Sequence, residues 1–186
     1  MEATDILMDE HRVIERVIGA LEVAARRLQQ GEPVRAELFL DAVDFIRSFA
    51  DGCHHAKEEG VLFKEMEAAG MPVQAGPIGV MLQEHELGRK YTRGLAEAAE
   101  RLKKGDREAG RAVAENAMGY AALLRQHILK EDQILFPMAG QVIPQGRHGE
   151  VLRKFHEAGH GSGDHDHAKH AHYVELGESL VTQAGS

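Results

Sequence analysis

Two segments of the chain place imidazole, carboxylate and apolar side chains in the same order. They read HHAKEEGVLF, which begins at His54, and QHILKEDQILFP, whose second residue is His127. Glu58 and Glu131 each follow their histidine by four residues, so on a helix both side chains of a pair project from one face. Histidine and glutamate together can bind metal ions, and histidine can also transfer protons near neutral pH. The repeated pairs are therefore candidates for a functional site.

A second, shorter repeat supplies two more histidines. LMDEH ends at His11 and MLQEH ends at His85, 74 residues later, while the two longer segments lie 73 residues apart. Similarity at a fixed period usually marks repeated structural units. We therefore interpret the chain as a duplicated helical hairpin.

Hydrophobic periodicity predicts the elements that must position these residues. Apolar residues recur at steps of three and four, which is typical of amphipathic helices, and strand signals are nearly absent. The repeated histidines and glutamates stand within the apolar stripes, where core residues belong. We expect an all-α fold, an antiparallel up-down-up-down four-helix bundle with short turns. The stripes cover residues 7–28, 39–61, 78–102 and 113–138, and helix ends are expected at residues 31–33, Gly70, Gly105 and before Pro144.

The bundle is expected to occupy residues 1–145, followed by a His-rich C-terminal extension over residues 146–186 that is partly helical. Residues 159–172, GHGSGDHDHAKHAH, are rich in glycine and are expected to begin as a loop. No core residues are assigned to the extension. Its histidines can hold divalent metals loosely, as His-rich tracts do; they are His165, His167, His170 and His172.

The extension also contains HEAGH at residues 156–160, which matches the His-Glu-x-x-His pattern of zinc proteases. That motif needs a stable helix to align both imidazoles, and Gly159 disfavours one. A metalloprotease is therefore not expected. Ferritin-like proteins use two Glu-x-x-His pairs, and this chain has one, from Glu157 to His160.

The distances from the expected turns bring the four repeated histidines to one level. If the first hairpin turns near Glu32, its histidines lie 21 residues before and 22 residues after the turn. In the second hairpin, turning after Gly105, they lie about 20 before and about 21 after. Buried imidazoles and carboxylates would cost much free energy unless a cation compensated them. The candidate metal ligands are His11, His54, Glu58, His85, His127 and Glu131.

This ligand set favours two metal ions over one. Imidazole with carboxylate suits iron, manganese or zinc, and six ligands exceed what one tetrahedral zinc ion can use. Two ions that share bridging carboxylates fit the count better.

The set and its spacing resemble the hemerythrin-like (HHE cation-binding) family over roughly residues 4 to 140. The resemblance implies a cofactor of two iron ions, a non-haem di-iron centre bridged by an oxo, hydroxo or water ligand. It implies that one histidine pair binds each iron and that the two glutamates bridge them. The implied pairs are His11 with His54 and His85 with His127, and the bridges are Glu58 and Glu131.

The sequence departs from the oxygen-carrying hemerythrins at two places. Their third helix supplies His-x-x-x-His, whereas this chain has Arg89 four residues after His85. Their fourth helix uses an aspartate five residues after its histidine, where this chain has Asp132. We prefer Glu131 as the bridge because it matches Glu58 in the repeat, with Asp132 as the alternative. One fewer histidine would leave an iron with an open position for a small ligand.

The resemblance implies that the protein binds oxygen, nitric oxide or a related small ligand for sensing, storage or detoxification. A di-iron oxidoreductase that reduces peroxide or oxygen and an iron or metal storage protein are the alternatives. Whether the protein is an enzyme stays open.

Residues next to the candidate ligands are expected to play lesser roles. His55 and Glu59 are expected on a solvated face, with His55 an extra or exchangeable ligand as the alternative. Glu10 and Glu84 are expected as exposed carboxylates, with a role in orienting an imidazole as the alternative. Tyr120 is expected in the core.

Composition excludes some partners. The net charge of −8 leaves no basic stripe for nucleic acid, and no apolar run approaches the roughly 20 residues that span a bilayer. The N-terminus lacks the pattern of an export signal, and the single cysteine, Cys53, can form no internal disulfide. A cytoplasmic protein without nucleic-acid or membrane partners is expected.

Overall fold

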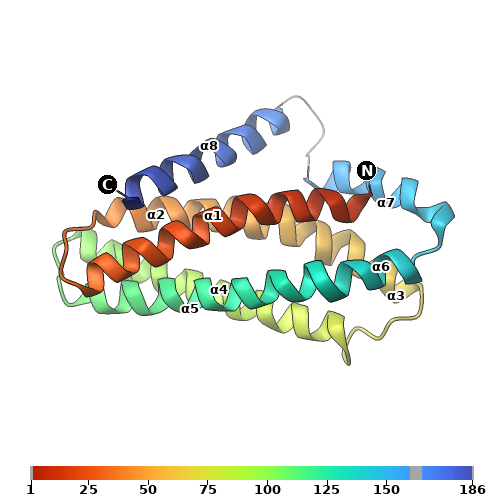
Figure 1. Ribbon diagram of the computed structural model, residues 1–186, viewed down its shortest axis with the longest axis horizontal. Helices are drawn as coiled ribbons and strands as arrows, with labels where there is room; N and C mark the ends of the chain where they lie inside the picture. Colours follow the sequence, from red (N-terminus) through yellow and green to blue (C-terminus); the bar gives the residue numbers. More distant parts are fainter. Residues whose placement is uncertain (1, 160–164, 186) are drawn as a thin grey trace.

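The computed structural model describes residues 2–159 and 165–185, and within these ranges the regular structure is helical, without strands (Figure 1). The predicted all-α class is confirmed. The elements are α1 (Ala3–Gln29), α2 (Ala36–Phe45), η1 (Ile46–His55), η2 (Glu58–Leu62), α3 (Phe63–Ala68), α4 (Pro77–Lys103), α5 (Ala109–Lys130), η3 (Glu131–Leu135), α6 (Phe136–Val142), η4 (Gln145–Arg147), α7 (His148–Gly159) and α8 (His165–Gly185).

Four long helical segments carry the predicted apolar stripes. The second is continuous from α2 to α3 and the fourth from α5 to α6, while α1 and α4 are single helices. α1 packs against α5, α4 against α5 and α2 against α4. The long segments therefore lie along one another in the longest direction of the molecule (Figure 1).

Two glycines end helices where the sequence predicted turns. Gly31 follows α1 with a φ of 80°, and Gly105 follows α4 with a φ of 93°. Left-handed backbone of this kind favours glycine, which has no Cβ to clash with the chain. Pro77 opens α4 at a position where no helical N–H is needed.

The apolar interior forms two clusters, one on each side of a polar layer. Ile14, Phe39 and Leu95 belong to one cluster, while Leu7 and Ile78 belong to the other. The candidate metal ligands separate these two clusters along each long segment. The fold therefore surrounds a polar layer with apolar side chains at both ends.

The C-terminal extension contributes to both clusters, although the sequence assigned no core residues to it. Val151 and Phe155 of α7 are buried beside η2, and Leu180 of α8 is buried against α1 and α2. The side chain of Val17 lies 3.3 Å from where a Cβ on Gly177 would stand, so α8 approaches α1 closely. Tyr173, Leu176, Leu180 and Ala184 recur at steps of three and four along α8, so the sequence did contain the periodic signal of this packing.

Part of the extension lies outside the described residues. Residues 160–164, which include His160 of the HEAGH motif, are not among the described residues. The helix α7 continues to Gly159, although the sequence disfavoured a helix there. α8 begins at His165, so the expected loop before it also falls outside the described residues. None of the described helices combines the length and apolar character needed to cross a membrane.

Candidate metal centre

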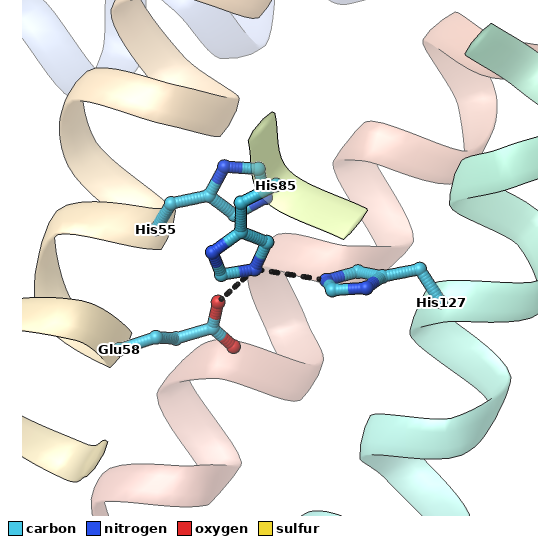
Figure 2. Close-up of side chains that lie close together, drawn as sticks. All are labelled: His55, Glu58, His85 and His127. Carbon is cyan, nitrogen blue, oxygen red and sulfur yellow. Dashed lines mark hydrogen bonds and ion pairs between the residues drawn. The ribbon is translucent and has the colours of Figure 1, made fainter. Parts of the chain in front are cut away.

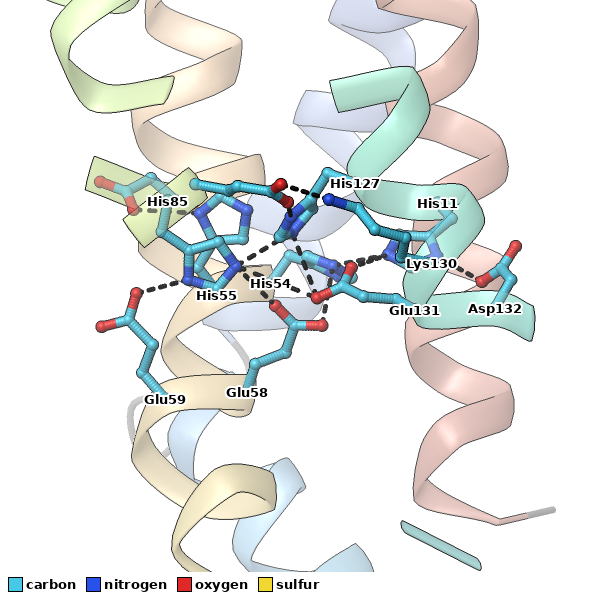
Figure 3. Close-up of polar contacts among 12 residues, drawn as sticks. His11, His54, His55, Glu58, Glu59, His85, His127, Lys130, Glu131 and Asp132 are labelled. Carbon is cyan, nitrogen blue, oxygen red and sulfur yellow. Dashed lines mark hydrogen bonds and ion pairs between the residues drawn. The ribbon is translucent and has the colours of Figure 1, made fainter. Parts of the chain in front are cut away.

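The four repeated histidines meet in two pairs between the apolar clusters (Figure 3). The Nε2 atoms of His11 and His54 are 3.0 Å apart, and those of His85 and His127 are also 3.0 Å apart. All four imidazoles are buried. The structure therefore brings together the residues that the sequence predicted to lie at one level.

The outward-facing nitrogen of each imidazole is held by a carboxylate. A carboxylate only accepts hydrogen bonds, so Nδ1 carries the proton and Nε2 keeps its lone pair. The four rings therefore aim lone pairs at the space between them. The Nδ1 atom of His11 donates to Asp132 (2.7 Å), that of His54 to Glu10 (3.0 Å), that of His85 to Glu59 (2.7 Å) and that of His127 to Glu84 (2.9 Å).

Glu58 turns its two oxygens toward different histidine pairs. Its Oε1 lies 3.5 Å from Nε2 of His54, and its Oε2 lies 3.4 Å from Nε2 of His85. Neither oxygen accepts a hydrogen bond from the described residues, although both are buried. This carboxylate thus spans the two pairs.

Glu131 repeats this arrangement from the fourth segment. Its Oε2 lies 3.3 Å from Nε2 of His11, and its Oε1 lies 3.1 Å from Nε2 of His127. Both of its oxygens are also buried without a hydrogen-bond donor among the described residues. Asp132 faces Nδ1 of His11 instead, on the outer side of that ring.

The backbone repeats together with the side chains. Glu58 begins the π-helical turn η2, and Glu131 begins the π-helical turn η3. Such turns are rare and occur frequently at functional sites. Each also precedes a phenylalanine that stacks on an imidazole of the other hairpin, Phe63 on His85 and Phe136 on His11.

These donors fit metal ions. Facing lone pairs 3.0 Å apart repel each other, and buried carboxylates without donors are costly, so the site calls for positive charge. Donors at right angles around an ion, each about 2.1 Å from it, lie about 3.0 Å from each other. The spacing of the imidazole nitrogens matches that arrangement.

Protons can supply the positive charge when metal is absent. Burial alone would lower the pKa of His11, but the nearby carboxylates of Asp132 and Glu131 raise it to about 9. Burial also disfavours the charged form of His127, yet the Glu131 carboxylate raises its pKa to about 10. Metal binding would therefore release protons from these rings.

Comparison with known proteins agrees with this donor set. A sequence profile of the hemerythrin HHE cation binding domain matches residues 2–139. The chain belongs to the hemerythrin HHE cation-binding family.

Relatives of this hemerythrin-family chain occur in mycobacteria. They include the uncharacterized proteins Rv1995 of Mycobacterium tuberculosis (strain ATCC 25618 / H37Rv) and Mb2018 of Mycobacterium bovis (strain ATCC BAA-935 / AF2122/97). Each is 25% identical over 158 residues, which cover 85% of this chain and 61% of the relative. The chain thus spans about three fifths of the length of these relatives.

Three neighbours of the candidate ligands in this HHE domain are not the solvated carboxylates that we expected. Glu10, Glu59 and Glu84 each hold an imidazole Nδ1. Such contacts fix the tautomer and orientation of a metal-binding histidine. The repeat contained the signal, because Glu10 matches Glu84 and Glu59 matches Asp132.

Two lysines extend these contacts. Lys57 donates to Glu10, and Lys130 donates to Glu84, from equivalent positions of the repeat. Burial opposes ionisation of Glu10, but His54 and Lys57 lower its pKa to about 2. Both glutamates are therefore ionised acceptors near neutral pH.

His55 is buried beside the centre of this HHE domain (Figure 2), so its expected place on a solvated face is wrong. Its ring stacks on that of His85 with centroids 3.8 Å apart. Burial, and next the nearby His85, lower its pKa well below the usual value. It belongs to a second group of donors with Glu58 and His127: potential ligand atoms of His55, Glu58, His85 and His127 lie within 4.8 Å of one another.

The backbone that carries His54 and His55 is the π-helix η1 and not an α-helix. In an α-helix, neighbouring residues lie about 100° apart around the axis, so His54 and His55 would face different directions. The i to i+5 bonding of a π-helix turns the chain less per residue. η1 ends at His55, and both histidines are buried.

A pocket of about 160 Å³ lies against this edge of the HHE domain's centre. Tyr120 is buried in its wall, as expected for a core residue, and its hydroxyl has no hydrogen-bond partner among the described residues. Burial raises the pKa of this phenol, which therefore keeps its proton. The lining includes Asp51, His55, His85, Arg89, Thr92 and Tyr120.

Proposed function

We propose that this HHE domain binds two iron ions as a non-haem di-iron centre. His11 and His54 hold one ion, His85 and His127 hold the other, and Glu58 and Glu131 bridge them. The observation that carries the proposal is the placement of the two carboxylates, because the oxygens of each lie within 3.1–3.5 Å of imidazole nitrogens from both pairs. We also propose that the four long segments form an antiparallel up-down-up-down bundle, with residues 146–186 as an extension.

The donor chemistry favours iron over zinc. Zinc in proteins is commonly tetrahedral, whereas imidazole spacings of 3.0 Å suit donors at right angles in a six-coordinate ion. Mixed imidazole and carboxylate ligands are typical of non-haem iron. Iron bound in such a site would bind oxygen or nitric oxide reversibly or transfer electrons to these molecules.

Binding of a small ligand is the proposed role of the centre. Two imidazoles and two carboxylate oxygens would give each ion four donors from the chain, fewer than a six-coordinate ion uses, so a position would remain for a small ligand. The pocket beside His55 and His85 gives small solutes access to the edge of the centre. We propose sensing, storage or detoxification of oxygen, nitric oxide or a related ligand, in the cytoplasm.

Tyr120 favours binding over turnover. Its hydroxyl can donate a hydrogen bond into the pocket, but burial raises its pKa, which makes it a poor acid. A di-iron oxidoreductase that reduces peroxide would need a proton donor that releases its proton more readily. The Tyr120 hydroxyl is therefore better suited to stabilising a bound ligand by a hydrogen bond than to donating a proton to it.

Adduct formation tests the role. The full chain, loaded with ferrous iron without air, should form a stable coloured adduct with oxygen or nitric oxide that reverses when the gas is removed. Sustained consumption of hydrogen peroxide without a stable adduct would instead support the oxidoreductase. Tight binding of clearly more than two metal ions per chain would support the metal storage protein.

A further inference from the structure

His55 has a buried nitrogen for which the described part of the chain provides no partner. Its Nε2 is buried and makes no hydrogen bond to any described residue, while its Nδ1 lies 3.2 Å from Oδ1 of Asp51. An interior polar atom left without a partner destabilises the folded protein. The buried nitrogen of this ring therefore calls for a partner other than the described residues.

The tautomer of His55 is set in the same way as that of the four repeated histidines. Asp51 can only accept, so Nδ1 of His55 donates the hydrogen bond and Nε2 keeps a lone pair. Five buried imidazoles of this chain thus share one pattern, with Nδ1 on a carboxylate and Nε2 available as a ligand atom.

Arg89 holds the carboxylates of two of these imidazoles together. Its Nε donates to Oδ1 of Asp51 over 2.9 Å, and its Nη2 donates to Oε1 of Glu59 over 2.8 Å. Asp51 in turn orients His55, and Glu59 orients His85. Arg89 is thus a positioning residue for two stacked rings.

From this geometry we infer that His55 is a third imidazole ligand of the metal ion held by His85 and His127. The inference rests on the proposed metal centre and adds a ligand to it. The ligand atoms of His55, His85 and His127 lie within 4.8 Å of one another and of Glu58 (Figure 2).

The repeat does not supply the same ligand to the other ion. The counterpart of His55 in the fourth segment is Ile128, a buried residue of the apolar core. The ion of His11 and His54 therefore has two imidazoles and the other has three. The two metal sites are inequivalent although their surrounding segments repeat.

His55 also forms part of the pocket wall, so its removal opens the metal to the pocket. The tests use the full chain loaded with ferrous iron, the variants His55→Gln and His55→Ala, and the control His156→Gln, which changes an exposed histidine of α7. Competition with a chelator measures the affinity of each ion, and iron-57 Mössbauer spectra report the surroundings of each.

Both His55 variants should lose affinity for one of the two ions by about 10-fold or more and change one iron signal, while the control matches the unchanged protein. Added free imidazole, which fits the space of the missing ring, should restore the signal in His55→Ala. Variants that keep both affinities and both signals would overturn the inference.

A measurement on the unchanged protein covers the case in which the variants do not fold. Zinc serves as a diamagnetic substitute, and the nitrogen-15 signal of His55 Nε2 is identified by its closeness to the His85 ring. This signal should shift on metal binding together with those of His85 and His127. A shift at His85 and His127 without one at His55 would overturn the inference alone, whereas a chain that holds no metal would also overturn the proposed centre.

Discussion

His11 donates a hydrogen bond from Nδ1 to the carboxylate of Asp132 over 2.7 Å, and so joins the first long helix to the fourth segment. Asp132 therefore lies on the outer side of the ring, away from the Nε2 atom that faces the centre. The neighbouring Glu131 reaches the inner side. This geometry separates a residue that orients a ligand from one that can bridge two metals.

Asp132→Asn should weaken metal binding by about 10-fold to 100-fold but leave two ions per chain, because His11 keeps a partner for its ring. Glu131→Gln should remove a bridge and abolish binding of at least one ion. Elemental analysis after gel filtration and chelator competition measure both. The opposite result, with Asp132→Asn losing the metal and Glu131→Gln keeping it, would assign the bridge to Asp132.

Glu59→Ala should also weaken metal binding by about 10-fold to 100-fold, since it frees Nδ1 of His85 and removes a partner of Arg89. The matched control is Glu97→Ala, which changes an exposed carboxylate of α4, the helix that carries His85, and should leave affinity unchanged. Chelator competition compares the two. Equal affinity in both variants would return Glu59 to the solvated role that the sequence suggested.

The two lysine–glutamate contacts should differ in strength, although they occupy equivalent positions of the repeat. Lys57→Met leaves Glu10 without its ion-pair partner in the interior, which should cost about 3–5 kcal/mol of unfolding free energy. Lys130→Met affects a pair that is more exposed, at 35% and 19%, and should cost about 1 kcal/mol or less. Urea denaturation of the metal-free protein measures both; equal losses would contradict the difference in burial.

Tyr120→Phe removes a buried hydroxyl that has no partner among the described residues, so the metal-free protein should keep or slightly gain stability. The variant should bind the small ligand about 10-fold more weakly if the phenol donates to it. Thermal denaturation and gas titration measure the two effects. A clear loss of stability would show that the hydroxyl has a structural partner.

Truncation after Gly146 should leave both metal ions bound, because every proposed ligand lies between His11 and Glu131. Losing the burial of Phe155 and Leu180 should nevertheless lower the melting temperature by roughly 10 °C. Phe155→Ala in the full chain isolates part of this loss. A folded truncated chain without metal would show that the extension completes the site.

The common level of most candidate ligands could be predicted because a helix has a fixed rise per residue, so sequence spacing sets the height of each side chain. The duplicated His-x-x-x-Glu pairs and their distances from the turns were enough to expect the ligands at one level. His55 could not be found in this way, because it is adjacent to His54 and the sequence predicted an α-helix, in which the two side chains would lie about 100° apart. The packing of α8 was missed although its stripe of Tyr173, Leu176, Leu180 and Ala184 is periodic, because the glycine- and histidine-rich stretch before it favoured a loop.

X-ray absorption at the iron edge, combined with metal analysis of the purified chain, tests the central claim most directly. Two ions bridged by Glu58 and Glu131 should give about two iron atoms per chain and iron–iron scattering at a separation of roughly 3–4 Å. The scattering should disappear in Glu58→Ala and in Glu131→Ala. A single zinc ion with no iron, or two irons without this scattering, would contradict a carboxylate-bridged di-iron centre.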